Sequence, residues 1–570
     1  MAGAKPAVVA LFGMPPTARA QMLAALCEDT GRSALVVCAG EADATRFAED
    51  AAVFGRRAEV FPARDYVLRP VEGQSHEYEY RRLAVLGNLV GGRTSVACAP
   101  VEAVLQYTTP KQEFCGNTLT VKQGMAISMD VLIERLFGAG YLRRFQVDGP
   151  GQFSVRGGIV DIYAPDMQKP HRLEFWGDEV DSIHSFDLVS QRREGAVKKI
   201  YLSPAREVLF GDTEAAARLL RTALSKAKPA YAEALADAMD GDLKALDAGT
   251  MPAAMDKYLA LRYEKPATIF EYFDAPIVFL NEPSAVREAA KGVEFRFGEA
   301  FKGLLEEGVL APGLDRFYED TAYLLHETEK RHAVVCENFA RTIPDLKLAD
   351  TVNAQTHSLP PWGGEVSALA DDLRPLTAQK YAVAVLAGTQ RAAAALARDL
   401  AAAGFSAQAY HKEPPSLAPG SVGVFEGHLN AGADYPFAKF AVFTSRRHNA
   451  AAPQKAKAKN KGLSSLSDIT PGDYVVHQNH GIGVYAGIQR LDLQGVVKDY
   501  IKINYDKADT LYVPVTQLDL ISRYTAPGDG ERVKLSKLGG DAWRADRFVC
   551  PAPAGPGLCV PRGQRVAAGF

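Results

Sequence analysis

Residues 152–193 read QFSVRGGIVDIYAPDMQKPHRLEFWGDEVDSIHSFDLVSQRR. Apolar and polar side chains alternate along the runs 153–163 and 171–183, and Gly-containing pairs interrupt the alternation. A period of two residues, broken by tight-turn residues, is typical of short antiparallel strands. The change of texture begins near residue 120, so we predict an inserted β-rich domain over residues 121–204.

The run RLEFW carries two different faces. Alternation places Arg172 and Trp176 on one face of the strand and Leu173 and Phe175 on the other, which would be the core face. Exposed Arg and Trp are enriched at protein–protein contacts, so together with Arg156 they predict a protein-binding face. An intramolecular stack of an arginine on Trp176 stays open as the alternative.

Outside this domain, short Val/Ile/Ala-rich runs alternate with amphipathic helical stretches, which is the rhythm of a parallel α/β sheet. The runs IVFLNEP (277–283) and HAVVCEN (332–338) come late in the chain but have the same buried-strand character. We therefore predict one discontinuous α/β domain made of residues 1–120 and 205–350, with an Ala-rich helical part from 205 to 270.

Four further segments follow. KYAVAVLAG begins a small α/β domain that we place at 375–446, after the turn-rich residues 351–374. Residues 447–467 are a basic linker, whose lysines either solubilise it or contact DNA phosphate. Short strands separated by Gly and Asn/Asp predict a small β-barrel at 468–537, and the Pro/Gly/Ala-rich residues 545–570 predict an aberrant disordered tail. The core of the barrel is predicted to contain Val475, Ile482, Val497, Ile501, Ile503 and Val513.

Composition limits the possible functions. The chain has 570 residues, a mass of 61.5 kDa and 47% hydrophobic residues, enough for several domains with their own cores. Lys and Arg total 65 against 68 Asp and Glu, a net charge of −3, so any nucleic-acid contact must be local. The seven cysteines are scattered, and no run is apolar enough for a signal peptide or a membrane span. We expect a cytoplasmic protein.

Phosphate-binding motifs are not found. The first strand-like run, AVVALFG, is followed by MPPTARAQM and not by a P-loop. A P-loop needs successive backbone N–H donors and a lysine, whereas Pro15 and Pro16 have no N–H. The glycines of HGIGVYAG precede a strand pattern and not a helix, so we expect Gly481, Gly483 and Gly487 in barrel turns and not at a dinucleotide.

Two further groups of residues could hold a metal or act in acid–base catalysis. His448, His477 and His480 lack a further ligand of suitable spacing, so we expect turn and surface histidines. Solvated hairpin charges are the commoner use of the second group. Its members are Asp161, Glu174, Asp178, Glu179 and Asp181. No Ser, Cys or His arrangement has a catalytic spacing, so the sequence favours a binding protein over an enzyme.

These residues make the chain similar to the transcription-repair coupling factor family, Mfd, over about residues 1–543. QFSVRGGIVDI with RLEFWGDEVDSIHSFDLVSQR resembles the family's domain related to the damage-verification protein UvrB. PGDYVVHQNHGIGVYAGI, YIKINYDKADTLYVPVTQLDLISRY and KLGGDAW resemble its RNA-polymerase-interacting domain, a Tudor-like barrel related to the CarD regulators.

The resemblance implies two partners in transcription-coupled nucleotide excision repair. In the family, the UvrB-like domain binds UvrA, and the barrel binds the β subunit of RNA polymerase by pairing strands edge to edge. The residues implicated in UvrA binding correspond to Arg156, Arg172, Phe175 and Trp176. The polymerase contact corresponds to the strand from Ile488 to Leu491.

The resemblance ends near Trp543. Family members continue into a motor that hydrolyses ATP and moves on double-stranded DNA, whereas this sequence turns into RADRFVCPAPAGPGLCVPRGQ. We therefore expect a truncated factor without the motor: not an enzyme, without a cofactor, with weak or no DNA binding and no membrane contact. Two other interpretations remain, a CarD-like polymerase-binding regulator without a repair role and a UvrB-type repair ATPase.

Overall fold

The computed structural model describes residues 5–445 except 65, 67, 69–75, 189, 253 and 412–415, and then 472–477, 481–493, 496–505, 510–514, 521–523 and 565–566, some of these by backbone only. The chain divides into two compact units. The first is Met1–Pro70 with Ser75–Arg447, and the second is Val71–Gln74 with His448–Phe570. Several sheets, one of them antiparallel and β-rich, confirm the predicted multidomain α/β class.

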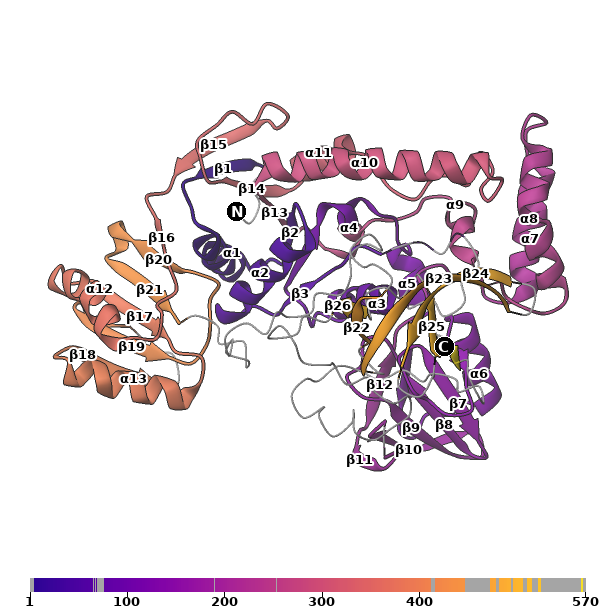
Figure 1. Ribbon diagram of the computed structural model, residues 1–570, viewed down its shortest axis with the longest axis horizontal. Coiled ribbons are helices and arrows are strands. Elements are labelled where there is room, and N and C mark those ends of the chain that lie inside the picture. Colours follow the sequence, from indigo (N-terminus) through magenta and orange to yellow (C-terminus); the bar gives the residue numbers. More distant parts are fainter. Residues whose placement is uncertain are drawn as a thin grey trace. The chain divides into compact units, whose positions relative to one another are not determined.

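The main sheet of the first unit is parallel throughout. Its strands are β1 (Val8–Phe12), β2 (Ala34–Cys38), β3 (Ala58–Val60), β4 (Val96–Pro100), β13 (Ile277–Asn281), β14 (His332–Glu337) and β15 (Leu348–Asn353). They lie in the order β15-β1-β14-β13-β2-β4-β3 (Figure 1). Parallel strands buried on both faces are read from sequence as continuous apolar runs, and the runs at 277–283 and 332–338 are confirmed as strands of this sheet.

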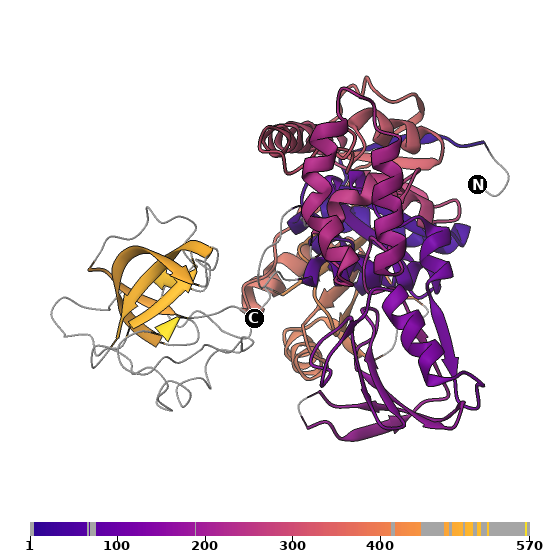
Figure 2. The same ribbon diagram turned by 90° about the vertical axis from the view of Figure 1, so that its right-hand side faces the viewer.

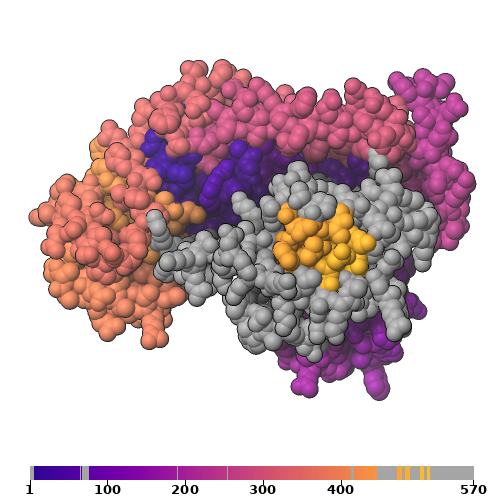
Figure 3. All heavy atoms as spheres, viewed as in Figure 1, coloured from indigo at the N-terminus to yellow at the C-terminus, as the bar shows by residue number. Residues whose placement is uncertain are grey.

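Helices cover both faces of the main sheet. They are α1 (Pro16–Thr30), α2 (Glu41–Val53), α3 (Glu77–Val90), α4 (Val101–Leu105), α5 (Lys111–Gly116), α10 (Pro283–Glu306) and α11 (Thr321–Glu329). Val36 packs with Leu23 of α1 and Phe47 of α2. Its neighbour Leu35 points to the other side and packs in the cluster that holds Leu83 of α3. The long helix α10 forms a ridge on the molecular surface (Figure 3).

The Ala-rich helical part is confirmed as α7 (Thr213–Ser225) and α8 (Ala232–Asp247). The two helices lie side by side (Figure 2) and share a core that includes Leu220 and Met239. Asp212 caps α7, since its carboxylate accepts a hydrogen bond from the N–H of Ala215 at 2.6 Å. Three short segments join this part to the main sheet: η1 (Met255–Tyr258), α9 (Leu259–Arg262) and η2 (Ile269–Tyr272).

The inserted domain contains two small sheets around one core. Its elements are β5 (Leu119–Lys122), α6 (Met129–Gly138), β6 (Leu142–Arg143), β7 (Gln152–Arg156), β8 (Ile159–Tyr163), β9 (His171–Trp176), β10 (Glu179–Phe186), β11 (Arg193–Ala196) and β12 (Lys199–Leu202). The larger sheet has the order β11-β10-β9-β8-β7-β6, and β12 pairs with β5. The predicted hairpin turn is present, because Trp176 pairs with Glu179 and Gly177 adopts φ 62°.

A smaller α/β part follows in the first unit. It consists of β16 (His357–Leu359), α12 (Val366–Ala378), β17 (Ala382–Leu386), α13 (Gln390–Ala402), β18 (Ser406–Tyr410), β19 (Ser421–Phe425), β20 (Gly432–Tyr435), η3 (Pro436–Ala438) and β21 (Phe440–Thr444). The predicted start at 375 is too late, because β16 belongs to this sheet and α12 packs Leu369 and Leu373 in its core. Most of α12 lies within residues 351–374, which were predicted as turn-rich throughout, and the helix continues past Pro375.

In the second unit, the described strands form one sheet in the order β26-β22-β23-β24-β25-β27. They are β22 (Tyr474–His477), β23 (Gly481–Leu493), β24 (Val496–Asn504), β25 (Thr510–Pro514), β26 (Ile521–Arg523) and β27 (Arg565–Val566). Four predicted core residues are fully buried: Val475, Ile501, Ile503 and Val513. Ile482 is only half-buried, and the side chain of Val497 lies outside the described residues.

The expectation that the glycines at 481 and 483 serve in turns is wrong. Both lie inside strand β23. A Cβ on Gly483 would come within 2.5 Å of Cγ2 of Ile503, so this glycine allows two strands to approach closely. Gly487, with φ 98°, lies where the register between β23 and β24 shifts.

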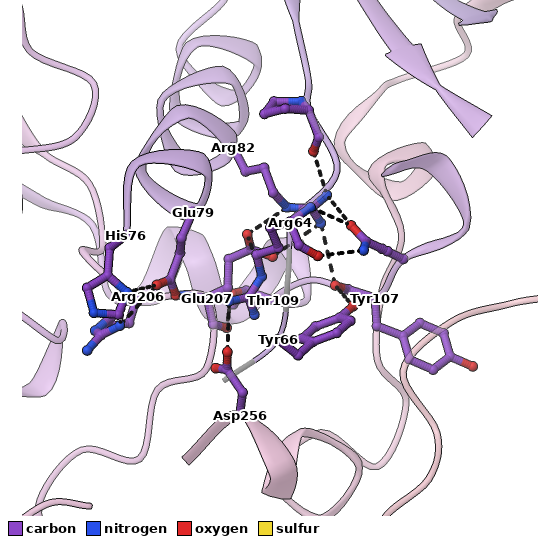
Figure 4. Close-up of polar contacts among 12 residues, drawn as sticks. Arg64, Tyr66, His76, Glu79, Arg82, Tyr107, Thr109, Arg206, Glu207 and Asp256 are labelled. Carbon is purple, nitrogen blue, oxygen red and sulfur yellow. Dashed lines mark hydrogen bonds and ion pairs between the residues drawn. The ribbon is translucent and has the colours of Figure 1, made fainter. Parts of the chain in front are cut away.

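A buried ion cluster connects the end of the inserted domain to the α/β core (Figure 4). The chain returns from β12 through Arg206 and Glu207. Glu207 accepts hydrogen bonds from Nε of Arg82 on α3 at 2.7 Å and lies 3.3 Å from Nε of Arg64. Nη1 of Arg64 is 2.9 Å from a carboxylate oxygen of Asp256 on η1.

Glu79 completes this cluster. Its carboxylate accepts a hydrogen bond from the N–H of Glu207 at 2.9 Å and one from Nη1 of Arg206 at 3.0 Å. The side chains of Arg82 and Glu207 are fully buried. Three arginines therefore meet three carboxylates in a water-poor site, and unpaired charges there would be costly. The cluster fixes where the inserted domain joins the α/β core.

The cluster predicts a large loss of stability when one charge is removed. Glu207→Gln removes the carboxylate shared by Arg64 and Arg82, so the free energy of unfolding should fall by about 3–5 kcal/mol. Urea denaturation followed by circular dichroism measures this loss. The matched control is Glu214→Gln, because Glu214 forms an exposed pair with Arg218 and should change stability by less than about 1 kcal/mol. Equal losses for the two variants would contradict the assigned role.

The stability should also depend on acid pH through Glu79. Burial alone would raise the pKa of Glu79, but the charges of Arg64 and Arg206 and hydrogen bonds from His76 and the Glu207 N–H hold it well below its usual value. A carboxylate with a lowered folded pKa stabilises the fold above the unfolded pKa of about 4.3, and this contribution is lost as pH falls toward the folded value.

We therefore expect the melting temperature of the parent chain to fall steeply from about pH 5 to pH 3. Glu79→Gln should be less stable at neutral pH but show a shallower fall over the same interval, since it lacks the titrating group. Thermal unfolding followed by circular dichroism at a series of pH values measures both profiles. Parallel profiles would show that Glu79 does not supply the pH dependence.

Candidate binding surfaces

Two consecutive hairpins, β7–β8 and β9–β10, position the predicted binding residues of the inserted domain. Asp161 on β8 stands directly opposite Ser154 on β7 and Arg172 on β9. Directly opposed residues project from the same face of a sheet, and so do residues two apart on one strand. Arg156, Asp161, Arg172 and Trp176 therefore share one face, as the alternation along the sequence predicted for Arg172 and Trp176.

Asp161 holds both arginines of this face. Its carboxylate accepts hydrogen bonds from Nη2 of Arg156 at 2.6 Å, from Nε of Arg172 at 2.7 Å and from Nη2 of Arg172 at 2.9 Å. The Asp161 side chain is 1% exposed, that of Arg172 is 14% exposed and that of Arg156 is 41% exposed. Arg172 is thus a half-buried partner of Asp161, whereas Arg156 is oriented by Asp161 and still faces solvent.

The guanidinium of Arg172 lies over the buried ring of Phe186, with 4.9 Å from Cζ to the ring centroid. The alternative of an intramolecular arginine–aromatic stack is therefore partly realised, but the ring is Phe186 and not Trp176. Hydrogen bonding to Asp161 raises the pKa of Arg172. Arg172 remains a cation held between a carboxylate and an aromatic ring.

The two predicted aromatic contact residues have different environments. Trp176 is 84% exposed at the end of β9. Phe175 is partly buried and packs against the core of the inserted domain. A partner that lies on this face would therefore meet the ring of Trp176 directly, whereas Phe175 supports the strand from beneath.

Sequence reasoning missed the role of Asp161, which it grouped with solvated hairpin charges. That expectation is wrong for Asp161, since its side chain is buried between two arginines. The available signal was the register, which pairs Asp161 with Arg172 across neighbouring strands. Of the other carboxylates, Glu174 forms an ion pair with Arg193 and accepts a hydrogen bond from Ser182 at 2.8 Å.

Across the described ranges, no three His, Cys, Asp or Glu side chains are grouped to hold a metal ion.

Two side chains at the start of α1, Arg19 and Thr17, form hydrogen bonds to other parts of the protein. The side chain of Arg19 is 1% exposed, and its guanidinium donates hydrogen bonds to Asn281 at 2.6 Å and Asn338 at 2.8 Å. The hydroxyl of Thr17 donates to the carbonyl of Ala431 at 3.0 Å, which joins α1 to the smaller α/β part. Arg19 is therefore committed to protein acceptors and acts as a structural residue.

Strand β23 contains the predicted polymerase-contact positions. Strand β22 pairs only with residues 481–484 of β23, whereas β24 pairs along β23 to its end at Leu493. Ile488 stands opposite Ile501 and Leu491 opposite Lys498. Among the described strands, none pairs with the second edge of β23 beyond residue 484.

The histidines of the second unit differ from the expectation. His477 lies in β22 and is 2% exposed, so the prediction of a turn or surface residue is wrong for it. His448, His480 and the lysines of the predicted linker 447–467 lie outside the described residues.

Within the described part of the chain, every helix is too short or too polar to cross a lipid bilayer.

Two segments of the chain match known domain families. Residues 119–208 match the family model of the UvrB interaction domain, and residues 469–525 match that of the CarD-like/TRCF RID domain. The fold and these matches define a multidomain protein that carries two interaction domains. Along nearly its whole length, the chain matches the N-terminal half of transcription-repair-coupling factors, as the resemblance implied.

Three relatives illustrate this match. The chain is 30% identical over 549 residues to the transcription-repair-coupling factor of Bacillus subtilis, which aligns 94% of this chain with 46% of that protein. Identity to the same factor of Staphylococcus aureus is 26% over 550 residues, with 93% and 46% aligned. For Staphylococcus epidermidis it is 26% over 555 residues, with 94% and 46% aligned. The chain thus spans about half the length of the curated relatives it matches.

Proposed function

We propose that this chain connects RNA polymerase to UvrA in transcription-coupled nucleotide excision repair. The observation that carries the proposal is the arginine pair held by Asp161 beside Trp176, on a domain that matches the UvrB interaction domain. In this proposal, Arg156 and Trp176 contact UvrA directly. Arg172 and Phe175 keep the contact face in place.

Preorganisation supports a binding role for this face. Asp161 orients the Arg156 guanidinium before a partner arrives, so less side-chain entropy is lost on binding. A guanidinium that already has one acceptor still offers further N–H groups to acceptors of a partner. The ring of Trp176 adds a large apolar area with few torsions to order. These are the properties of residues that contribute most of the free energy at protein contacts.

We further propose that the second unit is a Tudor/SH3-like barrel that binds the β subunit of RNA polymerase. Its support is the long strand β23, which among the described strands is paired on both sides at its start but on one side only around Ile488 and Leu491. An unpaired strand edge presents a row of backbone N–H and C=O groups. A partner strand could bind there through main-chain hydrogen bonds, with side chains supplying specificity.

The proposed role is binding, and no bond is made or broken in it. It requires neither a cofactor nor ATP hydrolysis by residues 1–570, and it places the chain in the cytoplasm with its two partners. The exposure of Arg156 and Trp176 and the position of Ile488 and Leu491 on strand β23 agree with this proposal.

The UvrA proposal predicts separate roles for the surface residues. Arg156→Ala and Trp176→Ala should each weaken binding of purified UvrA by about 1–3 kcal/mol. Trp176 is exposed, and Arg156→Ala leaves Asp161 with both of its hydrogen bonds from Arg172, so the melting curves should stay close to that of the parent chain. Titration calorimetry measures the binding and circular dichroism the folding. Arg172→Ala should weaken binding to a similar extent but also lower the melting temperature, because it removes a partner of Asp161.

The matched control for Trp176 is Phe437→Ala, since Phe437 on η3 is 83% exposed but belongs to the smaller α/β part. It should leave UvrA binding unchanged. Retention of the parent affinity by folded Arg156→Ala and Trp176→Ala would show that this face is only structural.

The polymerase proposal predicts that a charge placed in the β23 edge prevents strand addition. Leu491→Arg in the full chain should weaken capture of core RNA polymerase by about tenfold or more, since burying an unpaired cation is costly. Ile488→Arg should do the same, but position 488 shares the face of the buried Ile501 and also tests folding. Lys455→Ala in the linker should change only the salt dependence.

A pull-down of core polymerase measures this effect, with circular dichroism of each variant. Capture of parent strength by folded Leu491→Arg would exclude the position as the contact. Failure of the folded parent chain to capture polymerase would remove the polymerase assignment itself.

A further inference from the structure

The outer face of the two-stranded sheet β5–β12 concentrates positive charge. The register places Lys122 directly opposite Lys199 and Thr120 directly opposite Tyr201. The alternate residues Val121 and Ile200 point inward and are buried in the core of the inserted domain. Lys122, Lys199 and Tyr201 are exposed. One side of this small sheet is thus core, and the other presents two lysines and a tyrosine.

Two like charges directly opposite each other destabilise an antiparallel pair. In the part of the chain that the structure describes, neither Lys122 nor Lys199 forms an ion pair with a carboxylate. Some other lysines of the first unit do form such pairs, as Lys169 does with Glu194 at 2.6 Å, but the distinguishing feature of Lys122 and Lys199 is that they stand directly opposite each other. The opposed lysines therefore do not add to the stability of the fold. An anion of a binding partner would reduce the repulsion between them.

Tyr201, which follows Lys199 on the same face of the sheet, lies in the same positive potential. The ammonium of Lys199 lies 4.2 Å from the centroid of the Tyr201 ring, which is 44% exposed. Lys199, and after it Lys122 and Arg93, lower the pKa of the Tyr201 phenol. A phenol with a lowered pKa is a stronger hydrogen-bond donor. Arg93 contributes less net charge than the lysines, because it pairs with Asp166 at 2.6 Å.

We propose that this face, formed by Lys122, Lys199, Tyr201 and Thr120, binds the phosphate backbone of duplex DNA. Ammonium groups are point charges suited to phosphate oxygens, and tyrosine and threonine hydroxyls are frequent donors to phosphate. The face offers no apolar anchor other than one ring, whose π-system is already occupied by Lys199. A folded protein partner would need such an anchor, whereas a regular row of phosphates does not.

The proposal agrees with the overall charge of the chain. A net charge of −3 leaves room only for a local nucleic-acid contact, and a few lysines on one small sheet provide one. The contact carries no sequence information, since backbone contacts position a protein on DNA without reading bases. It does not depend on UvrA or polymerase binding, because none of its residues belongs to the other two surfaces.

The salt dependence of DNA binding by the full chain tests the proposal. Each phosphate neutralised contributes about 0.9 to the slope of log affinity against log salt concentration. Lys122→Gln and Lys199→Gln should each weaken binding of a short fluorescein-labelled duplex and lower the slope by about 1, and the double variant by about 2. Fluorescence anisotropy measures the affinity. The linker lysines are the same in all variants, so the difference between slopes isolates this face.

Three controls make the result decisive. Lys302→Gln, on the exposed side of α10, removes the same charge and should leave affinity and slope unchanged. Both β5–β12 variants should melt at or above the temperature of the parent chain, because each removes a like-charge repulsion. A polyglutamate peptide should compete poorly with the duplex. Unchanged slopes in the folded double variant, or equally effective competition by polyglutamate, would overturn the DNA assignment.

Discussion

The ion pair between Arg82 and Glu207 is the contact on which the arrangement of the first unit depends. Both side chains are fully buried, and Glu207 lies just after the last strand of the inserted domain. A buried carboxylate can be tolerated only where cations and N–H donors surround it, so the chain can return to the α/β core at one place only. The binding face and the lysine face of the inserted domain are both built on the strands that this contact anchors.

The degree of pairing distinguishes the cations that anchor this fold from those proposed to bind a partner. Arg82 is fully buried and has every contact within the fold. Arg156 has one carboxylate partner and is 41% exposed, so it is held and still presented. Lys122 and Lys199 are exposed and directly opposed. From the first to the last of these, the charge contributes less to folding and becomes more available to a partner. The number of Arg and Lys residues in the sequence does not show which of them are fully paired, partly paired or unpaired in the fold.

What could be predicted from sequence depended on whether the signal was local. The parallel strands are continuous apolar runs, and the hairpin turn after Trp176 needs a glycine, so both were read directly. The burial of Asp161 is decided by Arg156 and Arg172, which come from other strands, so no local pattern shows it. Helix α12 was missed because residues 351–374 were treated as one turn-rich segment, although Leu369 and Leu373 in its second part pack in a core. His477 was misplaced because a polar residue on a strand can be buried when neighbouring strands supply its contacts.

The two surfaces proposed to bind partner proteins lie on separately packed units, and this bears on how recruitment could work. The core around Val475 and Ile501 shares no residue with the core around Leu173 that supports the proposed UvrA-binding face. Free energies of sites without shared partners usually add, so binding of one protein need not change the affinity for the other. Coupling between the partners then arises from the chain itself. Holding one partner raises the effective concentration of the second site beside it, which strengthens the joint assembly without any new contact.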